Sequence, residues 1–191
     1  DVVLVGEIRD EETATIALQA SLTGHLVLST LHTNDSVGAV ARLRDYGLPS
    51  FVINSSLLGV MAQRLVRRVC QHCVVNDEVD EMMQHRFALQ DTTGFVRGKG
   101  CGRCSQTGYR GRLGLYELLT LTEPVKDLVE QGAPVDRIRR RAVNDGMRLM
   151  WKDGLDKARM GQTTLNEVAN VASVIELGED AESVESWRNV A

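Results

Sequence analysis

Two pairs of cysteines constrain this fold more than any other feature of the sequence. Each pair has two intervening residues, in Cys70-Gln71-His72-Cys73 and Cys101-Gly102-Arg103-Cys104, and no cysteine is left over. Two thiolates at this spacing in a tight turn can face one tetrahedral metal ion, and glycines around the second pair favour such a turn. We expect residues 70–108 to form a small, loop-rich module around a structural zinc ion. Its ligands would be Cys70, Cys73, Cys101 and Cys104.

Two disulfides or four free thiols are the alternatives to a metal site. The sequence shows no secretory signal peptide and no apolar segment near the ~18 residues that cross a bilayer, so we expect a reducing compartment, which disfavours disulfides. His72 could compete as a ligand, but four thiolates already complete a tetrahedral site. Such a closed site has no open coordination position, so the metal would stabilise the module and not take part in catalysis.

The N-terminal part alternates apolar runs with helix-capping residues. Residues 2–5 and 26–31 are typical of strands that are covered on both faces. Asp10 is placed to cap a helix over residues 13–22, and Thr33-Asn34-Asp35 to cap a second helix. This order predicts an α/β fold in which a parallel sheet lies between layers of helices.

The remaining sequence predicts two more strands and a helical end. Residues 59–69 and 113–121 have the apolar character of strands, and the second would return along the sheet. Thr122 is placed to cap the first of four helices, and Thr164-Leu165-Asn166-Glu167 has the pattern of a capping box that opens the last. The chain starts at Asp1 and runs directly into an apolar segment, so we expect it to be the C-terminal piece of a longer protein.

Charge and aromatic content disfavour a nucleic-acid-binding function. The net charge is −4, and residues 176–191, with five acidic residues against Arg188, account for it; we expect this segment to be a flexible acidic tail. Two Trp, three Tyr and three Phe supply few stacking platforms. Arginines near the second cysteine pair (Arg103, Arg110, Arg112) and the run Arg139-Arg140-Arg141 keep a zinc-ribbon nucleic-acid module open as an alternative. An arginine triple in a helix is usually a solvated face or pairs with nearby acids.

Polar residues follow the two predicted parallel strands. Ligands of α/β sheets bind beyond the carboxyl ends of the strands, where Glu7 follows the first strand and His32 the second. Glu7 could orient or deprotonate a water or hold a metal-bound water, and His32 could hydrogen-bond a terminal phosphate. The alternatives are that Glu7 is a capping or salt-bridging group, that Arg9 and Asp10 form a surface pair, and that His25 is structural. Gly98-Lys99-Gly100 lacks the GxxxxGK[ST] pattern of a phosphate-binding loop.

Two longer segments resemble motifs of one enzyme family. Residues 1–10, DVVLVGEIRD, look like the Walker B segment of secretion ATPases, and residues 23–34, TGHLVLSTLHTN, look like their His box. With residues 63–68, the cysteine pairs and the segments 115–119 and 153–155, residues 1–175 resemble the type II secretion ATPases and the related type IV pilus assembly ATPases. The resemblance implies the C-terminal part of a RecA-like P-loop NTPase core over 1–69, the tetracysteine module over 70–108, and a strand with a helical subdomain over 109–175.

The resemblance also implies roles for individual residues. Glu7 matches the Walker B glutamate, and His25 and His32 match the His-box histidines, with His32 as the expected γ-phosphate sensor. Gly6, Arg9, His25 and Thr30 would lie near the nucleotide. Many P-loop enzymes have an acidic residue where Gly6 stands, so direct ligation of Mg²⁺ by Glu7 does not follow from the resemblance.

At the level of the whole protein, the resemblance implies a hexameric ring on the cytoplasmic face of the inner membrane. ATP hydrolysis with Mg²⁺ would drive pseudopilus assembly and protein export, or pilus extension, through contacts with membrane platform proteins and without nucleic acid. The cysteine module favours a secretion or assembly enzyme over a pilus retraction ATPase. The phosphate-binding loop of the family would precede Asp1, so we expect this chain alone not to hydrolyse ATP.

Overall fold

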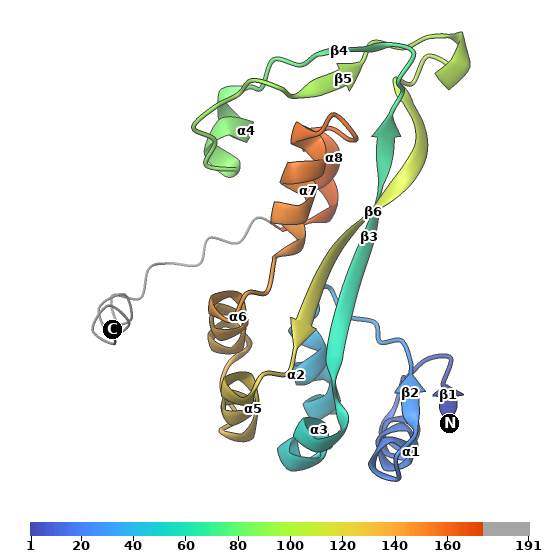
Figure 1. Ribbon diagram of the computed structural model, residues 1–191, viewed down its shortest axis with the longest axis vertical. Coiled ribbons are helices and arrows are strands. Elements are labelled where there is room, and N and C mark those ends of the chain that lie inside the picture. Colours follow the sequence, from blue (N-terminus) through green and yellow to red (C-terminus); the bar gives the residue numbers. More distant parts are fainter. Residues whose placement is uncertain (174–191) are drawn as a thin grey trace, which may run out of the picture.

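The protein is built along one long antiparallel ribbon, as the computed structural model of residues 1–173 shows (Figure 1). The ribbon consists of β3 (Gly59–Val69) and β6 (Tyr109–Thr120), with Gly59 opposite Thr120 and Arg67 opposite Arg112. Apolar side chains alternate between a buried face and an exposed one, the period expected of a strand. The strand predicted over residues 59–69 is therefore confirmed over its full length. The strand predicted over 113–121 begins earlier, at Tyr109, and ends at Thr120.

A small parallel sheet lies beside the lower end of the ribbon. It pairs β1 (Val2–Leu4) with β2 (Leu26–Leu28), and α1 (Glu11–Leu22) makes the crossover between them. The Asp10 carboxylate accepts a hydrogen bond of 2.8 Å from the Thr13 N–H, which confirms the predicted cap. The predicted strand–helix–strand order is thus present.

One face of this parallel sheet is exposed, which corrects the prediction of strands covered on both faces. Side chains on that face are between 47% and 78% exposed: Val2, Leu4, Leu26 and Leu28. The reason is that α1 packs against β2 on one side, while no element of residues 1–173 packs on the other. The second strand also ends at Leu28 and does not reach residue 31.

A first apolar core surrounds the lower half of the ribbon. Besides α1 it includes α2 (Gly38–Asp45), α3 (Ser50–Ser56), α5 (Glu123–Glu130) and α6 (Val135–Asn144). Leu119 of β6 and Ile138 of α6 are completely buried in it. Thr122 is the N-cap of α5 as predicted, but its hydroxyl donates to Asp145 and does not cap the helix.

A second apolar core lies higher on the ribbon, between α7 (Met150–Arg159), α8 (Leu165–Val171) and α4 (Glu81–Arg86). Thr164 caps α8 by accepting from the Glu167 N–H at 3.3 Å. The Glu167 carboxylate, expected to complete a capping box, instead receives hydrogen bonds from the backbone and the guanidinium of Arg67. This carboxylate therefore ties α8 to β3.

The cysteine module forms the upper end of the molecule (Figure 1). It contains α4, the short antiparallel pair β4 (Val74–Asn76) and β5 (Val96–Gly98), and a 3₁₀ turn at Gly102–Cys104. Met83, Phe87 and Phe95 of the module belong to the second core, together with residues of α7 and α8. The acidic segment 176–191 lies outside the described residues, and within residues 1–173 no helix is long and apolar enough to span a membrane.

Candidate functional site

The carboxyl ends of β1 and β2 continue side by side beyond the strands. The Val5 N–H donates to the Leu28 carbonyl and the Ile8 N–H to the Thr30 carbonyl, each at 2.9 Å. The Thr30 hydroxyl donates to the Gly6 carbonyl, also at 2.9 Å. These bonds place Gly6 and Thr30 at one edge of the sheet, while their closeness to a nucleotide stays a prediction.

Glu7 and His32 meet at this edge. The His32 Nε2 lies 2.5 Å from Glu7 Oε1, and the Arg9 guanidinium binds the other oxygen, Oε2, through Nε at 2.6 Å and Nη2 at 2.5 Å. The Glu7 side chain is 18% exposed, whereas those of His32 and Arg9 are 86% and 75% exposed. The predicted meeting of an acid and an imidazole is therefore present, while their chemical roles stay predictions.

The surroundings of Glu7 keep its carboxylate ionised. The hydrogen bond from Arg9 lowers the pKa of Glu7, burial opposes this, and the nearby charges of Arg9 and His32 lower it further. Asp10 does not form the alternative surface pair with Arg9, because its carboxylate caps α1; the hydrogen bonds from Thr13 lower the pKa of Asp10.

The two oxygens of the Glu7 carboxylate face different partners. Oε2 is held by Arg9, while Oε1 is shielded from solvent and lies against the imidazole of His32. A carboxylate oxygen is able to accept more than one hydrogen bond, so Oε1 has capacity for a water, including a water bound to Mg²⁺, beside its contact with His32. The carboxylate therefore fits a site for a hydrated Mg²⁺ ion.

His25 lies at the opposite end of the sheet. It precedes the first residue of β2, and its Nδ1 is 3.2 Å from both the Ala20 carbonyl and the Thr23 hydroxyl at the end of α1. The structure therefore does not bring His25 together with Glu7 and His32. Its contacts agree with the alternative that it is structural.

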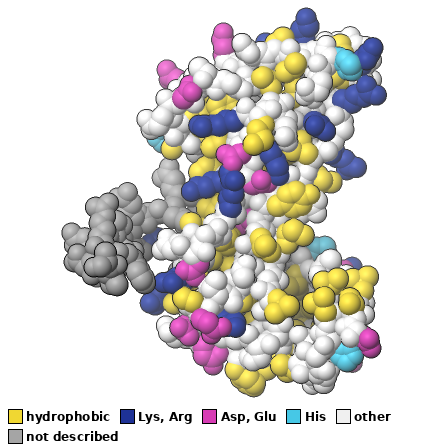
Figure 2. Space-filling model, viewed as in Figure 1, with side chains coloured by type: hydrophobic (Ala, Val, Ile, Leu, Met, Phe, Trp, Pro, Cys, Tyr) yellow, Lys and Arg dark blue, Asp and Glu magenta, His cyan; other side chains and the backbone are white. Residues whose placement is uncertain are grey.

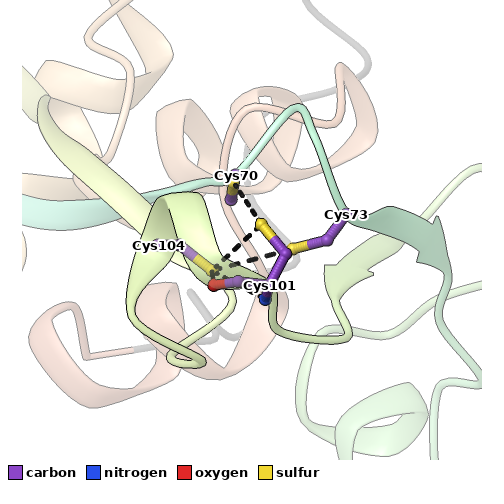
Figure 3. Close-up of side chains that lie close together, drawn as sticks. All are labelled: Cys70, Cys73, Cys101 and Cys104. Carbon is purple, nitrogen blue, oxygen red and sulfur yellow. Dashed lines mark hydrogen bonds between the residues drawn. The ribbon is translucent and has the colours of Figure 1, made fainter.

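The four cysteines form a single cluster, with their sulfur atoms pointing toward one another (Figure 3). All four sulfurs lie within 4.8 Å of one another. The separations are 4.0 Å for Cys70–Cys101, 3.9 Å for Cys73–Cys104 and 3.7 Å for Cys101–Cys104. A tetrahedral zinc ion with Zn–S bonds of about 2.3 Å places its sulfurs about 3.8 Å apart, so the donor set fits zinc.

The four cysteines are free thiols, and the surrounding protein shifts the pKa values of Cys73 and Cys104 in opposite directions. Burial, more than any other influence, raises the pKa of Cys73 to about 12. Burial acts the same way on Cys104, but the N–H groups of Cys101 and Gly108 stabilise its thiolate, and the pKa of Cys104 is lowered to about 6. His72 is not part of the cluster and lies 3.0 Å from the guanidinium of Arg103, as expected of a bystander.

Several arginines that support the nucleic-acid alternative are engaged within the protein. Figure 2 shows basic side chains over the upper half of the molecule, interleaved with acidic ones. Arg103 contacts His72, and the Arg139 side chain, only 8% exposed, pairs with Asp35 and Asp136. Arg139 is therefore not part of a solvated face.

Sequence reasoning did not identify Glu117 as a site residue. Its carboxylate is buried in β6 and accepts hydrogen bonds from Ser36, which follows closely on His32, and from the start of α7. The signal in the sequence was an acidic residue in the inward register of an apolar strand, between Leu115 and Leu119. Such a residue needs buried donors.

The comparisons with known proteins agree on one family. A family model described as "Type II/IV secretion system protein" matches residues 1–170. The type II secretion system ATPase E of Vibrio cholerae is 50% identical over 175 residues, which cover 90% of this chain and 34% of the relative. The type IV pilus assembly ATPase PilB of Thermus thermophilus is 45% identical over 172 residues, which cover 88% of this chain and 19% of the relative.

The fold also has counterparts among solved structures. The ATPase DotB of Legionella pneumophila superposes with a TM-score of 0.60 at 25% identity, over 89% of this chain and 38% of that one. The Yersinia pseudotuberculosis DotB gives 0.62 at 16% identity, over 91% of this chain and 37% of that one, a likeness of fold alone. The chain thus spans about a third of the length of the Vibrio cholerae relative and less of PilB.

Proposed function

Because this chain belongs to the type II/IV secretion system protein family, we propose that Glu7 and His32 form the nucleotide-facing edge of an ATPase that drives protein secretion. The observation that carries the proposal is the 2.5 Å contact between His32 and Glu7 at the carboxyl ends of two parallel strands. Ligands of α/β sheets bind at such edges. The relatives named as ATPases support the same activity for the complete protein.

The residues of the edge have separate tasks in this proposal. ATP and Mg²⁺ would supply the phosphoryl group and the positive charge that offsets its negative oxygens. Arg9 holds one oxygen of Glu7 and keeps the carboxylate ionised, so that the second oxygen, which lies against His32, is able to orient the attacking water. His32 presents an exposed imidazole that is able to hydrogen-bond the terminal phosphate. Gly6 and Thr30 fix the backbone of the edge.

The complete enzyme needs more than these residues. The 191-residue sequence has no GxxxxGK[ST] motif, and we expect the chain by itself to show no ATP turnover above a heat-treated control. We propose that the complete protein has a RecA-like core, forms a hexameric ring and acts on the cytoplasmic face of the inner membrane, where platform proteins bind it. The sulfur cluster would hold a structural zinc ion.

The proposal predicts a large loss of activity when Glu7 is neutralised in the complete ATPase. Glu7→Gln keeps the shape of the side chain but removes the charge, and we expect kcat to fall by about 10²–10⁴-fold, with a small change in KM for ATP. Steady-state ATP hydrolysis measures both constants. Glu12→Gln, an exposed glutamate of α1, is the matched control. A kcat of the Glu7→Gln enzyme within twofold of the kcat of the control would contradict the proposal.

Type IV pilus extension is the second candidate function. The 45% identity to a PilB supports it directly. The complete protein would be supplied to two strains, one without its secretion ATPase and one without its pilus assembly ATPase. Release of a secreted reporter enzyme or the appearance of surface pili then distinguishes the two functions, with a Glu7→Gln variant as the negative control.

A further inference from the structure

The loop that follows His32 is attached to distant parts of the fold. The Asn34 carbonyl accepts a hydrogen bond of 3.4 Å from Arg64 of β3. Asp35 pairs with Arg139 of α6, and Ser36 bonds to Glu117 of β6. Three consecutive residues are therefore fixed by three elements that lie far from them in the sequence.

Glu117 is the most buried of these attachments. Its Oε1 accepts from both the N–H and the hydroxyl of Ser36, each at 2.8 Å, and Ser36 is completely buried. Its Oε2 accepts from the Met150 N–H at the start of α7, at 3.1 Å. A single carboxylate thus joins the His32 loop to α7. Such a group is costly to bury unless its oxygens are satisfied, and here both are.

Asp35 makes the second attachment through both of its oxygens. Oδ1 accepts from the Gly38 N–H at 2.7 Å and so caps α2, while Oδ2 lies 2.7 Å from Arg139 Nη2. Arg139 is held from its other side by Asp136 of its own helix, at 2.6 Å. The guanidinium therefore has a fixed position from which it holds the loop.

His32 needs such support because its own contact is weak. Its imidazole is 86% exposed, so water competes for the contact with Glu7, and holding the ring in one orientation costs side-chain entropy. The orientation of the ring over Glu7 must therefore come from the backbone that carries it. That backbone is fixed at Asn34, Asp35 and Ser36.

We propose that Glu117 and Arg139 are positioning residues, which hold the His32 loop so that the imidazole faces Glu7. The inference rests on the proposed function for its effect on catalysis, but the placement of His32 can be tested without activity. Neither residue touches the edge itself, and both act through Ser36 and Asp35.

Three mild substitutions test the proposal. Ser36→Ala removes one hydrogen bond to Glu117, and Asp35→Asn keeps the cap on Gly38 but turns an amide N–H toward Arg139. Glu117→Gln places an amide donor against the Met150 N–H. Because Glu117 is buried, this variant is the one most prone to misfold, and Ser36→Ala and Asp35→Asn then decide the test. Asp127→Asn is the matched control, because Asp127 is an exposed aspartate of α5 that takes no part in the attachment of the loop.

The first measurement follows the His32 ring in the full 191-residue chain by NMR. Glu7→Gln defines the ring resonances when the contact is lost. We expect Ser36→Ala and Asp35→Asn to move the His32 resonances toward that position, and Asp127→Asn to leave them in place. A purely structural role would lower the unfolding temperature of the variants without moving the His32 resonances.

The second measurement is ATP hydrolysis by the complete enzyme carrying the same substitutions. We expect kcat to fall about tenfold for Ser36→Ala and Asp35→Asn, with KM for ATP within about twofold, because misplacement of a catalytic group acts on the chemical step. The positioning role would be overturned if Ser36→Ala and Asp35→Asn leave the His32 resonances unmoved. It would also be overturned if these variants leave kcat unchanged while His32→Ala is inactive. Resonances that move while Glu7→Gln stays active would overturn the proposed function and support the placement.

Discussion

At the scale of single residues, Glu7 depends on Arg9. The hydrogen bond from Arg9 is the main cause of the lowered pKa of Glu7. Arg9→Ala should raise that pKa toward its ordinary value, so the complete ATPase should lose activity at a higher pH when the solution is made acidic. A pH profile of kcat measures the shift, and Arg9→Lys should restore part of it. An unchanged acid limb would show that Arg9 does not control Glu7.

Glu167 makes a second residue-scale prediction, on stability. Burial raises the pKa of Glu167, but the hydrogen bonds and charge of Arg67 outweigh it, and the net shift is downward. The carboxylate therefore stabilises the fold above its unfolded pKa, and this stability is lost as the pH falls through the folded pKa. Glu167→Gln should lower the free energy of unfolding by about 1–3 kcal/mol at pH 7 and by less in acid.

Urea unfolding at several pH values measures this difference. Glu123→Gln is the control, because Glu123 is 83% exposed and its ion-pair partner among residues 1–173 is Lys126 of the same helix. A Glu167→Gln chain that loses the same stability at every pH would contradict the assignment.

Local patterns predicted the residues whose partners lie near them in the sequence. Asp10 caps the helix that follows it, and the cysteine spacing indicated one cluster. The buried contacts of Glu117 and Arg139 could not be predicted from local patterns, because their partners, Ser36 and Asp35, lie 81 and 104 positions away in the sequence. Only the folded chain shows that these charges are buried and paired.

At the scale of elements, α7 packs closely on its neighbours at Gly154. A Cβ there would lie 2.5 Å from a methyl of Val168 in α8 and 3.0 Å from one of Leu115 in β6. Alanine normally favours a helix over glycine by about 1 kcal/mol, but here the clash should dominate, and Gly154→Ala should lower stability by about 1–3 kcal/mol. Thermal unfolding measures the effect, and Lys152→Ala on the exposed side of α7 is the control. A more stable Gly154→Ala chain would refute the close packing.

The elements themselves were mostly predictable, but their surroundings were not. The strand over 59–69 and the helix capped by Asp10 follow from local periodicity and capping. The run 2–5 suggested a strand covered twice, whereas Leu4 is 78% exposed. An apolar run indicates what a strand could pack against, and it does not show what covers it in a given chain.

At the scale of the whole molecule, removal of metal should act unevenly. We expect one zinc ion per chain by elemental analysis, and we expect a chelator to speed amide hydrogen exchange in residues 70–108. The first core shares no cysteine and should keep its protection. Metal binding should weaken as the pH falls, because protons compete for the thiolates. The His72→Ala chain should retain the zinc ion, and the Cys101→Ser chain should lose it. If chelation speeds amide exchange equally in residues 70–108 and in the first core, the expected confinement of the effect to the cysteine module is wrong.

The register of the ribbon has a consequence for how such proteins diversify. Val69 at the end of β3 is paired with Tyr109 at the start of β6, so the chain leaves the ribbon and returns to it at nearly the same place. The intervening excursion can therefore be gained, shortened or exchanged in evolution without rethreading the two strands. Because Met83, Phe87 and Phe95 cover part of α7 and α8, a lineage that discards the excursion must also make those helix surfaces polar.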